Sequence, residues 1–328
     1  MKAVWFERKG PAADVLTYGE MDDPRPAPGE VRLRLAFSGI NPGDVKKRLG
    51  TYQSAMAFPR IIPHTDGSGT VDQVGDGVSP DWIGKQVWCS YAQTYRPFGT
   101  AAEYTTVPVH CVAEAPQALD PAQAACLGIP GITGHRAVFA DGPVTGRTVL
   151  VVAGTGGVGR AAVVLAKRGG ARVIATVSKE HQLTEALSAG ADHALLAGDH
   201  LAAQVKEIVP QGVDRIIEVA FSDNIHQDVE MLAIGGTVVS YSSRDDRPHI
   251  PFRSMVFNNL TARMIGYDDF PADAVSAAMK DVTAAAAAGD LTYPIGKTFP
   301  LEQTAQAEQA LENRSVPGRV VVAVQHGH

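Results

Sequence analysis

The feature that most restricts the fold of this chain is a glycine-rich turn between an apolar strand and a helix. The stretch "VLVVAGTGGVGRAAVVLAK" spans residues 149–167, and its Gly154, Gly156 and Gly159 match the pattern G-x-G-x-x-G. Such glycines permit a tight turn, close approach of the backbone to a pyrophosphate, and packing of the helix against the strand. The amino end of the helix also offers free N–H groups and a partial positive charge to phosphates. A second strand at 171–177 follows, as this motif requires, so the sequence predicts a dinucleotide-binding turn.

The end of the strand at 171–177 indicates which dinucleotide this turn binds. An acidic side chain there would accept hydrogen bonds from the ribose 2′-OH of NAD, but the sequence continues with Ser178 and Lys179. Lys179 can neutralise a 2′-phosphate, so these two residues favour NADPH. The alternative is that Lys179 is an ordinary solvated lysine at a helix start, although a cation there opposes the helix dipole. A P-loop is excluded, because no Gly-Lys-Ser/Thr closes the turn.

Strands and helices alternate in the second half of the chain, whereas the first half is rich in strands. Residues 1–125 hold β-rich stretches separated by Gly, Pro and Asp, and they indicate an irregular, partly open β-barrel. The later alternation predicts a parallel sheet covered on both faces, with elements at 147–153, 157–169, 171–177, 179–190, 214–220, 224–236 and 237–243. A last helix at 300–313 and a last strand at 318–325 are expected to return to the first domain. The predicted fold class is α/β with two domains.

Composition excludes several classes of function. The 328 residues are 45% hydrophobic with a net charge of −6, which supports a sizeable core and disfavours nucleic acid or another polyanionic partner. Cys89, Cys111 and Cys126 form no CxxC pair and are interpreted as reduced thiols. The sequence contains no signal-peptide pattern and no run of about 18 apolar residues. We therefore expect a cytoplasmic protein with no membrane partner.

Six stretches carry a resemblance to a known family. They are "SGINPGDVKKRLGTY" (38–52), "DGSGTVDQVGDGV" (66–78), "LGIPGITGHRAV" (127–138), "AGTGGVG" (153–159), "IIEVAFSDN" (216–224) and "GGTVVSYSSR" (235–244). Over essentially the whole chain the sequence resembles the medium-chain dehydrogenase/reductase superfamily, and within it the zinc-free, zeta-crystallin type of NADPH:quinone oxidoreductase. The resemblance implies a GroES-like substrate domain at 1–123, completed by 268–328, and a Rossmann NADP(H)-binding domain at 124–267. It also implies a substrate site in the cleft between these domains, and a homodimer.

The residues at the metal positions of the family do not suit zinc. The resemblance places Ser38, Thr65 and Ile129 where zinc-dependent alcohol dehydrogenases have a catalytic Cys, a His and a later Cys or acid. A catalytic zinc needs three good N, S or O donors, and Ile129 offers none. The four-cysteine structural lobe of those enzymes is also missing. His64 stands one residue before the expected ligand and, without partners, is interpreted as a structural or cleft-edge histidine. The expectation is a zinc-free site.

The resemblance also assigns site residues position by position. It implies Asn41 and Tyr52 as catalytic residues, with Tyr52 donating a hydrogen bond or a proton to the developing oxyanion. The alternatives are that Asn41 is a turn residue before Pro42 and that Tyr52 is half-buried packing. The cofactor-binding residues implied beside Ser178 and Lys179 are Thr155, Gly156, Gly157, Val158, Gly159, Asn224, Tyr241, Ser242, Ser243, Arg244, Tyr267 and Arg319. Ala197 stands where relatives often carry Tyr or His near the adenosine phosphate, which removes one support for the 2′-phosphate.

The expected chemistry follows from the missing metal ligands. With no metal to polarise an alkoxide, a plain alcohol is a difficult substrate, whereas an electron-poor quinone accepts hydride with little help beyond positioning. The resemblance therefore implies an oxidoreductase that transfers hydride from NADPH to a quinone. The alternative reaction is reduction of an alkenal, enone or enoyl-thioester double bond, which the sequence does not separate from the first. A non-enzymatic cofactor-binding or RNA-binding role is disfavoured by the acidic balance and by the lack of a basic–aromatic stripe.

Overall fold

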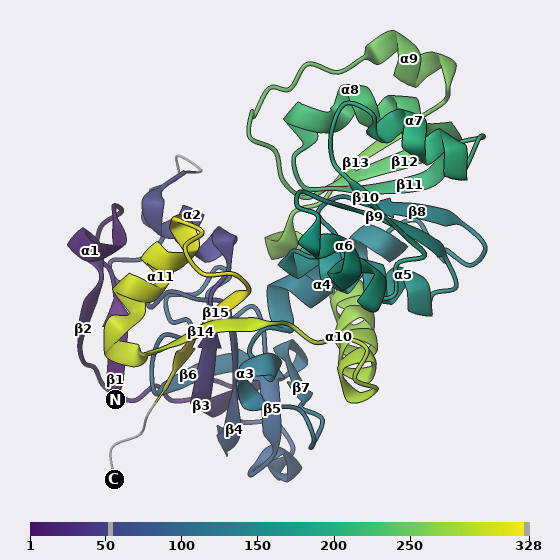
Figure 1. Cartoon of the computed structure of the whole chain (residues 1–328). Coiled ribbons are helices and arrows are strands. Elements are labelled where there is room, and N and C mark those ends of the chain that lie inside the picture. Colours follow the sequence, from purple (N-terminus) through teal and green to yellow (C-terminus); the bar gives the residue numbers. More distant parts are fainter. Residues whose placement is uncertain (52–54, 325–328) are drawn as a thin grey trace. The chain divides into compact units, whose positions relative to one another are not determined.

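The computed structural model describes residues 1–51 and 55–324 of the chain. The chain divides into two compact units, whose elements are drawn in Figure 1. Unit 1 consists of Met1–Ile129 together with the chain from Thr292 onward, and unit 2 consists of Pro130–Leu291. None of the helices in the described ranges has the length and the apolar character that crossing a membrane requires.

Unit 1 is built around a seven-stranded sheet in the order β14-β15-β3-β4-β5-β7, with β6 paired to β3. Its strands are β3 (Glu30–Gly39), β4 (Asp66–Val74), β5 (Gln86–Cys89), β6 (Tyr104–Pro108), β7 (Val112–Glu114), β14 (Ile295–Pro300) and β15 (Arg319–Ala323). In β3 the alternation "VRLRL" buries Val31, Leu33 and Leu35 and leaves Arg34 exposed, because successive side chains of a strand face opposite sides. The three buried residues belong to the core of unit 1.

Short elements complete unit 1. They are the paired strands β1 (Lys2–Trp5) and β2 (Thr17–Glu20), the helices α1 (Ala12–Val15), α2 (Pro42–Leu49), α3 (Pro121–Ala124) and α11 (Thr304–Glu312), and the 3₁₀ turns η1 (Pro80–Trp82), η2 (Val109–Cys111) and η4 (Leu301–Gln303). Strand β15 pairs antiparallel with β3, with Val321 opposite Gly39. The last strand thus returns to the sheet of the first domain, as the sequence predicts.

Unit 2 is a parallel six-stranded sheet in the order β10-β9-β8-β11-β12-β13, with helices along its connections (Figure 1). The strands are β8 (Thr148–Val151), β9 (Arg172–Val177), β10 (His193–Leu196), β11 (Val213–Glu218), β12 (Leu232–Ser240) and β13 (Thr261–Met264). The helices are α4 (Gly128–Phe139), α5 (Gly157–Arg168), α6 (His181–Ser188), α7 (Leu201–Ile208), α8 (Phe221–Met231), α9 (Phe252–Phe257) and α10 (Ala272–Ala287), with the 3₁₀ turn η3 (Tyr267–Asp269). Numbered along the chain, this strand order is 3-2-1-4-5-6, the doubly wound order of dinucleotide-binding folds. The expected α/β class, with a GroES-like and a Rossmann-type part, is confirmed.

The continuous apolar run of β8 follows from burial on both faces of the sheet. Val149 and Val151 pack into one core cluster with Val163 of α5, whereas Leu150 packs into a second cluster with Ile225 of α8. A strand covered on both sides has no polar face, so "TVLV" is buried at every position.

The structure differs from the expected boundaries in two places. The helix expected at 224–236 ends at Met231, because Leu232 is already extended, with φ of −73° and ψ of 144°, and begins β12. Unit 2 also runs to Leu291, beyond the expected boundary at 267, because α10 packs against α5. Elements β10, α7, α9 and β13 were not expected from the sequence.

Candidate active site

The glycine turn lies at the carboxyl end of β8 and leads directly into α5. Ala153 adopts a left-handed backbone with φ of 54°, and a Cβ on Gly154 would lie only 2.7 Å from the Cβ of Ala175 in β9. A Cβ on Gly159 would lie 2.1 Å from the Ala153 carbonyl oxygen, so helix and turn are in direct backbone contact there. Gly156 is the N-cap of α5, and the first N–H groups of this helix have no intrahelical acceptor. The turn therefore fits the pyrophosphate of a dinucleotide.

The remaining cofactor residues predicted in unit 2 follow the carboxyl ends of neighbouring strands. Parallel strands end at one edge of a sheet, so the fold brings these residues to the same edge as the glycine turn. The glycine turn follows β8 and contains Thr155, Gly156, Gly157, Val158 and Gly159. On one side of β8 in the sheet, Ser178 and Lys179 follow β9. On the other side, Asn224 comes after β11, Tyr241–Arg244 after β12 and Tyr267 after β13.

Ser178 and Lys179 are exposed at the end of β9. The Ser178 hydroxyl and the Lys179 backbone N–H both donate to Gln182 Oε1, at 3.2 and 3.1 Å. Gln182 lies in the first turn of α6 and so fixes the backbone from which the lysine extends. Within residues 1–51 and 55–324 the Lys179 ammonium has no ion-pair partner, which leaves its charge available to a ligand.

Residues after β11 and β12 form a hydrogen-bonded group around Glu218. Asn224 donates its Nδ2 group to both carboxylate oxygens of Glu218, at 3.1 and 3.2 Å. The Tyr241 backbone N–H donates to the Glu218 carbonyl oxygen at 3.3 Å, which ties the ends of β11 and β12 together. Burial, and then the charge of Glu218, raise the pKa of the Tyr241 phenol, so this side chain stays neutral.

The other predicted residues after β12 and β13 have contacts within unit 2. Arg244 is 83% exposed in its side chain and pairs with Asp223 at 3.0 Å. The Ser243 hydroxyl accepts from the Ser222 backbone N–H at 3.2 Å, and the Ser242 carbonyl oxygen accepts from Phe221 N–H at the same distance. Tyr267 lies in η3 with its ring 5.9 Å from that of Phe270, in an edge-to-face arrangement.

In unit 1 the structure brings together two of the predicted residues, Asn41 and Arg319. Arg319 Nη2 donates to Asn41 Oδ1 at 2.7 Å and to the Ile40 carbonyl oxygen at 3.1 Å. Asn41 Nδ2 donates to Asp66 Oδ2 at 2.7 Å, so both ends of its amide are held. Asn41 is the N-cap of α2 and is only 1% exposed. Arg319 is placed in unit 1, and Tyr52 lies outside the described residues.

Asp66 is the centre of a buried polar network that sequence reasoning did not find. Besides Asn41, its carboxyl group accepts from Ser90 Oγ at 2.5 Å and from the Ile129 backbone N–H at 2.7 Å. Complete burial, and then the nearby Asp44 carboxyl, raise the pKa of Asp66 to about 7, and burial likewise raises the pKa of Asp44. The one indication in the sequence is that Asp66 is a charged residue within "HTDGSG". The neighbouring residues do not indicate which side chains it contacts.

The residues at the family's zinc positions contact other polar residues and do not fit a metal. Ser38 Oγ lies 2.8 Å from His64 Nδ1 and 2.7 Å from Thr100 Oγ1. Thr65 Oγ1 donates to Asp44 Oδ1 at 2.9 Å, and Ile129 contributes only an apolar side chain. In the described residues no group of three His, Cys, Asp or Glu side chains is arranged to hold a metal ion.

His64 occupies a backbone position that ordinarily suits glycine. Its φ is 73° and its side chain is fully buried, with Nε2 3.3 Å from Glu308 Oε1. A bulky residue in the left-handed region is strained, so the imidazole contacts with Ser38 and Glu308 offset that strain. This supports a structural histidine.

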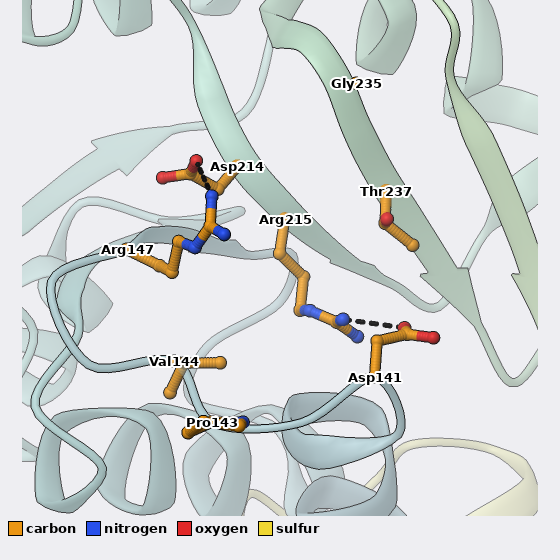
Figure 2. A pocket seen from close by; sticks show the side chains of 8 residues that line it. All are labelled: Asp141, Pro143, Val144, Arg147, Asp214, Arg215, Gly235 and Thr237. Atoms are coloured by element: carbon orange, nitrogen blue, oxygen red, sulfur yellow. Dashed lines mark hydrogen bonds and ion pairs between the residues drawn. The ribbon is translucent and has the colours of Figure 1, made fainter.

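A separate cavity of about 160 Å³ lies at the amino ends of β8, β11 and β12, at the opposite edge of the sheet from the glycine turn (Figure 2). Its charged groups are already paired: Arg147 with Asp214 at 3.0 Å, and Arg215 with Asp141 at 2.6 Å. Arg263 also pairs with Asp141. These ion pairs stabilise the loops that lead into the amino ends of the strands. Because the charges neutralise one another, the cavity is not considered part of the candidate site.

Comparisons with known proteins identify the family. A family model described as "Alcohol dehydrogenase GroES-like domain" matches residues 27–117, and one described as "Zinc-binding dehydrogenase" matches residues 157–283. A quinone oxidoreductase of Rattus norvegicus is 30% identical over 302 residues, covering 89% of this chain and 88% of the relative. The chain belongs to the medium-chain dehydrogenase/reductase superfamily. As a member of that superfamily it is an NAD(P)-dependent oxidoreductase.

Solved structures of the superfamily superpose over nearly the whole chain. An NAD-dependent alcohol dehydrogenase matches with a TM-score of 0.87 and 27% identity, over 99% of this chain and 100% of that one. A mycobacterial protein complexed with NADPH matches with a TM-score of 0.85 and 26% identity, over 98% and 100%. Solved structures of this fold therefore include an NAD-dependent alcohol dehydrogenase and a protein complexed with NADPH.

Proposed function

We propose that the protein is a zinc-independent oxidoreductase that transfers hydride from NADPH to a quinone. The observation that carries the proposal is the set of residues at the family's zinc positions, where Ser38, Thr65 and Ile129 offer no set of good ligands. The similarity to the rat quinone oxidoreductase supports the substrate class.

For the cofactor, the fit of the glycine turn and the free charge of Lys179 support NADPH. When bound, NADPH supplies the hydride. The first N–H groups of α5 would hold the pyrophosphate, and Lys179 would neutralise the 2′-phosphate in a charge-assisted contact. The hydrogen bonds of Gln182 to Ser178 and to the Lys179 backbone fix the loop from which this contact is made.

Asn41 and Tyr52 are proposed to act on the substrate side of the reaction, and Arg319 is proposed to contact the cofactor, as the family resemblance implies. Asn41 is buried and held at both ends by Asp66 and Arg319, which favours a role in positioning the turn at 40–42. Tyr52, assigned by family resemblance, is proposed to donate a hydrogen bond or a proton to the oxyanion that forms as a carbonyl oxygen gains charge.

A paired substrate assay tests this function. One simple quinone and one simple enone are each mixed with enzyme and NADPH, and the loss of NADPH absorbance is followed. The proposal expects faster turnover of the quinone, and faster turnover of the enone would assign double-bond reduction instead. Metal analysis is expected to find no stoichiometric zinc, and chelators are expected to leave the rate unchanged. About one zinc per chain, lost together with activity, would contradict zinc independence.

We also propose that two copies of the chain form a homodimer through the edge of the unit 2 sheet. Strand β13 is the last strand in the sheet order, and this strand and the segments beside it expose large apolar side chains. These are Ile234, Phe252, Phe257 and Met264, with exposed fractions of 77, 67, 80 and 59%. Ile234 lies beside the end of α9, because the N–H of Gly235 donates to the Asn258 carbonyl oxygen. An open strand edge flanked by apolar residues suits a two-fold contact, since both copies present the same surface.

A further inference from the structure

Two carboxyl groups, those of Glu218 and Asp228, are in hydrogen-bonding contact in the interior of unit 2, next to the turn that follows β11. Glu218, the last residue of β11, is 0% exposed, and Asp228 of α8 is 1% exposed. Neither carboxyl oxygen of Asp228 has a hydrogen-bond donor from the rest of the described structure. Among residues 1–51 and 55–324 no Lys, Arg or His forms an ion pair with either group.

Such a pair cannot carry two charges. A buried carboxylate without donors or cations is strongly disfavoured, and two of them in contact repel each other. Burial, and then the neighbouring Glu218, raise the pKa of Asp228 to about 9. Glu218 is the better anion of the two, because it accepts from Asn224 Nδ2 and from the Ala220 backbone N–H, although burial raises its pKa as well. At neutral pH the proton therefore resides on Asp228, which donates to Glu218.

The pair sits where it can control residues 219–224, which comprise the turn after β11 and the first residues of α8 and are called the 219–224 loop below. The hydrogen bonds from Ala220 N–H and from the Asn224 side chain end on the Glu218 carboxylate, so the carboxylate fixes both ends of that loop. The same loop leaves the carboxyl edge of the sheet beside the glycine turn, since β11 pairs with β8. Tyr241, at the end of β12, is the other titratable group facing Glu218, and it stays neutral.

We propose that Asp228 is a positioning residue for cofactor binding: as a neutral acid it donates a hydrogen bond to Glu218, and Glu218 in turn holds the 219–224 loop in the shape that receives the dinucleotide. The identity of the ligand in this inference rests on the proposed function, in which NADPH is the cofactor. The structural part of the inference rests on the contact between Glu218 and Asp228. Ionisation of Asp228 places a second negative charge against Glu218, which releases the loop.

The test uses Asp228→Asn, which keeps a neutral donor of the same shape but cannot ionise. Asp228→Ala removes the donor, and Glu230→Gln, which changes an exposed acid on the same helix outside residues 219–224, is the matched control. The dissociation constant of NADPH is measured by fluorescence titration from about pH 7 to about pH 10. For the wild type and Glu230→Gln this constant is expected to rise about tenfold toward the upper limit, because above the pKa the protonated fraction of Asp228 falls about tenfold with each pH unit. Asp228→Asn is expected to bind as the wild type does at pH 7 and to stay constant to pH 10. The proposal would be overturned if the NADPH dissociation constant of Asp228→Asn rose with pH as that of the wild type does. It would also be overturned if Asp228→Asn bound NADPH at pH 7 as weakly as Asp228→Ala.

A second measurement does not depend on the ligand. Infrared difference spectra between the wild type and Asp228→Asn are expected to show the carbonyl stretch of a protonated acid at neutral pH. Hydrogen exchange at 219–224 is expected to be faster in Asp228→Ala and unchanged in Asp228→Asn. If the wild type binds no nicotinamide dinucleotide while both results hold, the proposed function fails and the Asp228–Glu218 arrangement stands. If the infrared band is missing, the arrangement itself is wrong.

Discussion

Arg48 and Glu308 form a fully buried ion pair in unit 1 across 260 positions of sequence, with Arg48 Nε 2.5 Å from Glu308 Oε2. The guanidinium also contacts Glu312 and the Gly10 carbonyl oxygen, so its donors are satisfied on three sides. Glu308 Oε1 lies 3.3 Å from His64 Nε2, and His64 contacts Ser38. The contacts of His64 and Arg48 lower the pKa of Glu308 although burial opposes this. The pair therefore joins α11 to α2 and to the residues before β4.

We expect Glu308→Ala to destabilise the protein by about 3–5 kcal/mol, because it leaves the Arg48 charge buried with only one carboxylate beside it. Glu308→Gln is expected to cost less, since the amide oxygen still accepts from Arg48. Urea unfolding at neutral pH measures both differences. Glu302→Ala, an exposed acid in η4, is the control and is expected to change the free energy of unfolding by no more than about 0.5 kcal/mol. Equal losses for Glu302→Ala and Glu308→Ala would show that the ion pair contributes nothing specific.

Asp66 is expected to make stability fall as pH rises from about 4 to about 7. Its pKa in the folded protein is about 7 against 3.8 for the ordinary group, so over this range the folded state holds a proton that the unfolded state has lost. One such proton gives a slope of about 1.4 kcal/mol per pH unit. Above pH 7 both states are ionised and the contribution becomes constant. Asp66→Asn is expected to lose this part of the slope in urea unfolding measured at several pH values, and an unchanged slope would contradict the raised pKa.

Lys179→Ala is expected to raise the KM for NADPH by about tenfold or more and to leave the KM for NADH nearly unchanged. A charge-assisted contact of a partly exposed lysine with phosphate is worth about 1.5–3 kcal/mol, so the wild type should prefer NADPH by about 10–150-fold. The preference for NADPH is expected to lie toward the lower end of this range, because Ala197 stands where relatives often carry Tyr or His near the adenosine phosphate. The mutant should also show a weaker salt dependence for NADPH, since a screened charge pair is gone. Lys206→Ala, an exposed lysine of α7, is the control, and equal weakening of both cofactors in Lys179→Ala would assign that residue another role.

Light scattering at micromolar concentration is expected to give the mass of a dimer for the wild type. Phe257→Glu with Met264→Glu places one charge beside the edge strand β13 and one at its end, and this double variant is expected to be monomeric with an unchanged thermal unfolding temperature of each unit. Ile83→Glu changes a residue of unit 1 that is 52% exposed, and it should leave the dimer intact. A monomeric wild type, or a dimer that survives the double change, would exclude this interface.

Local patterns predicted most of the fold. The run "RTVLVVAGTGGVG" contains strand, turn and helix start within a few residues, and the glycines meet backbone or side-chain atoms of their immediate surroundings. The alternation in "VRLRL" gave β3 its buried face in the same way. Elements without such a signal were not expected: β13 has no buried apolar face, and three of its four residues are exposed.

The polar contacts of the candidate site could not be predicted from local sequence patterns. Arg319 is predicted to contact the cofactor, and nothing near it in the sequence indicated its hydrogen bond to Asn41, 278 positions away. Asp228 gives a weaker signal, because it shares the buried face of α8 with Ile225 and Val229 at helical spacing. A charged residue on an apolar stripe indicates a buried partner, but the partner's identity depends on which strand end lies opposite. The sheet order decides that, and it is set by the whole of unit 2.

Because β15 pairs with β3, unit 1 can be completed only after the end of the chain has been synthesised. The ribosome makes residues 1–129 first, then all of unit 2, and only afterwards the segment with Glu308, Arg319 and β15. Unit 2 is continuous and can close as soon as it has emerged, whereas β3 keeps an open edge and Arg48 an unneutralised charge for the whole of that interval. Nascent unit 1 is therefore the part of the chain most in need of a chaperone, because unpaired strand edges are where growing chains associate wrongly.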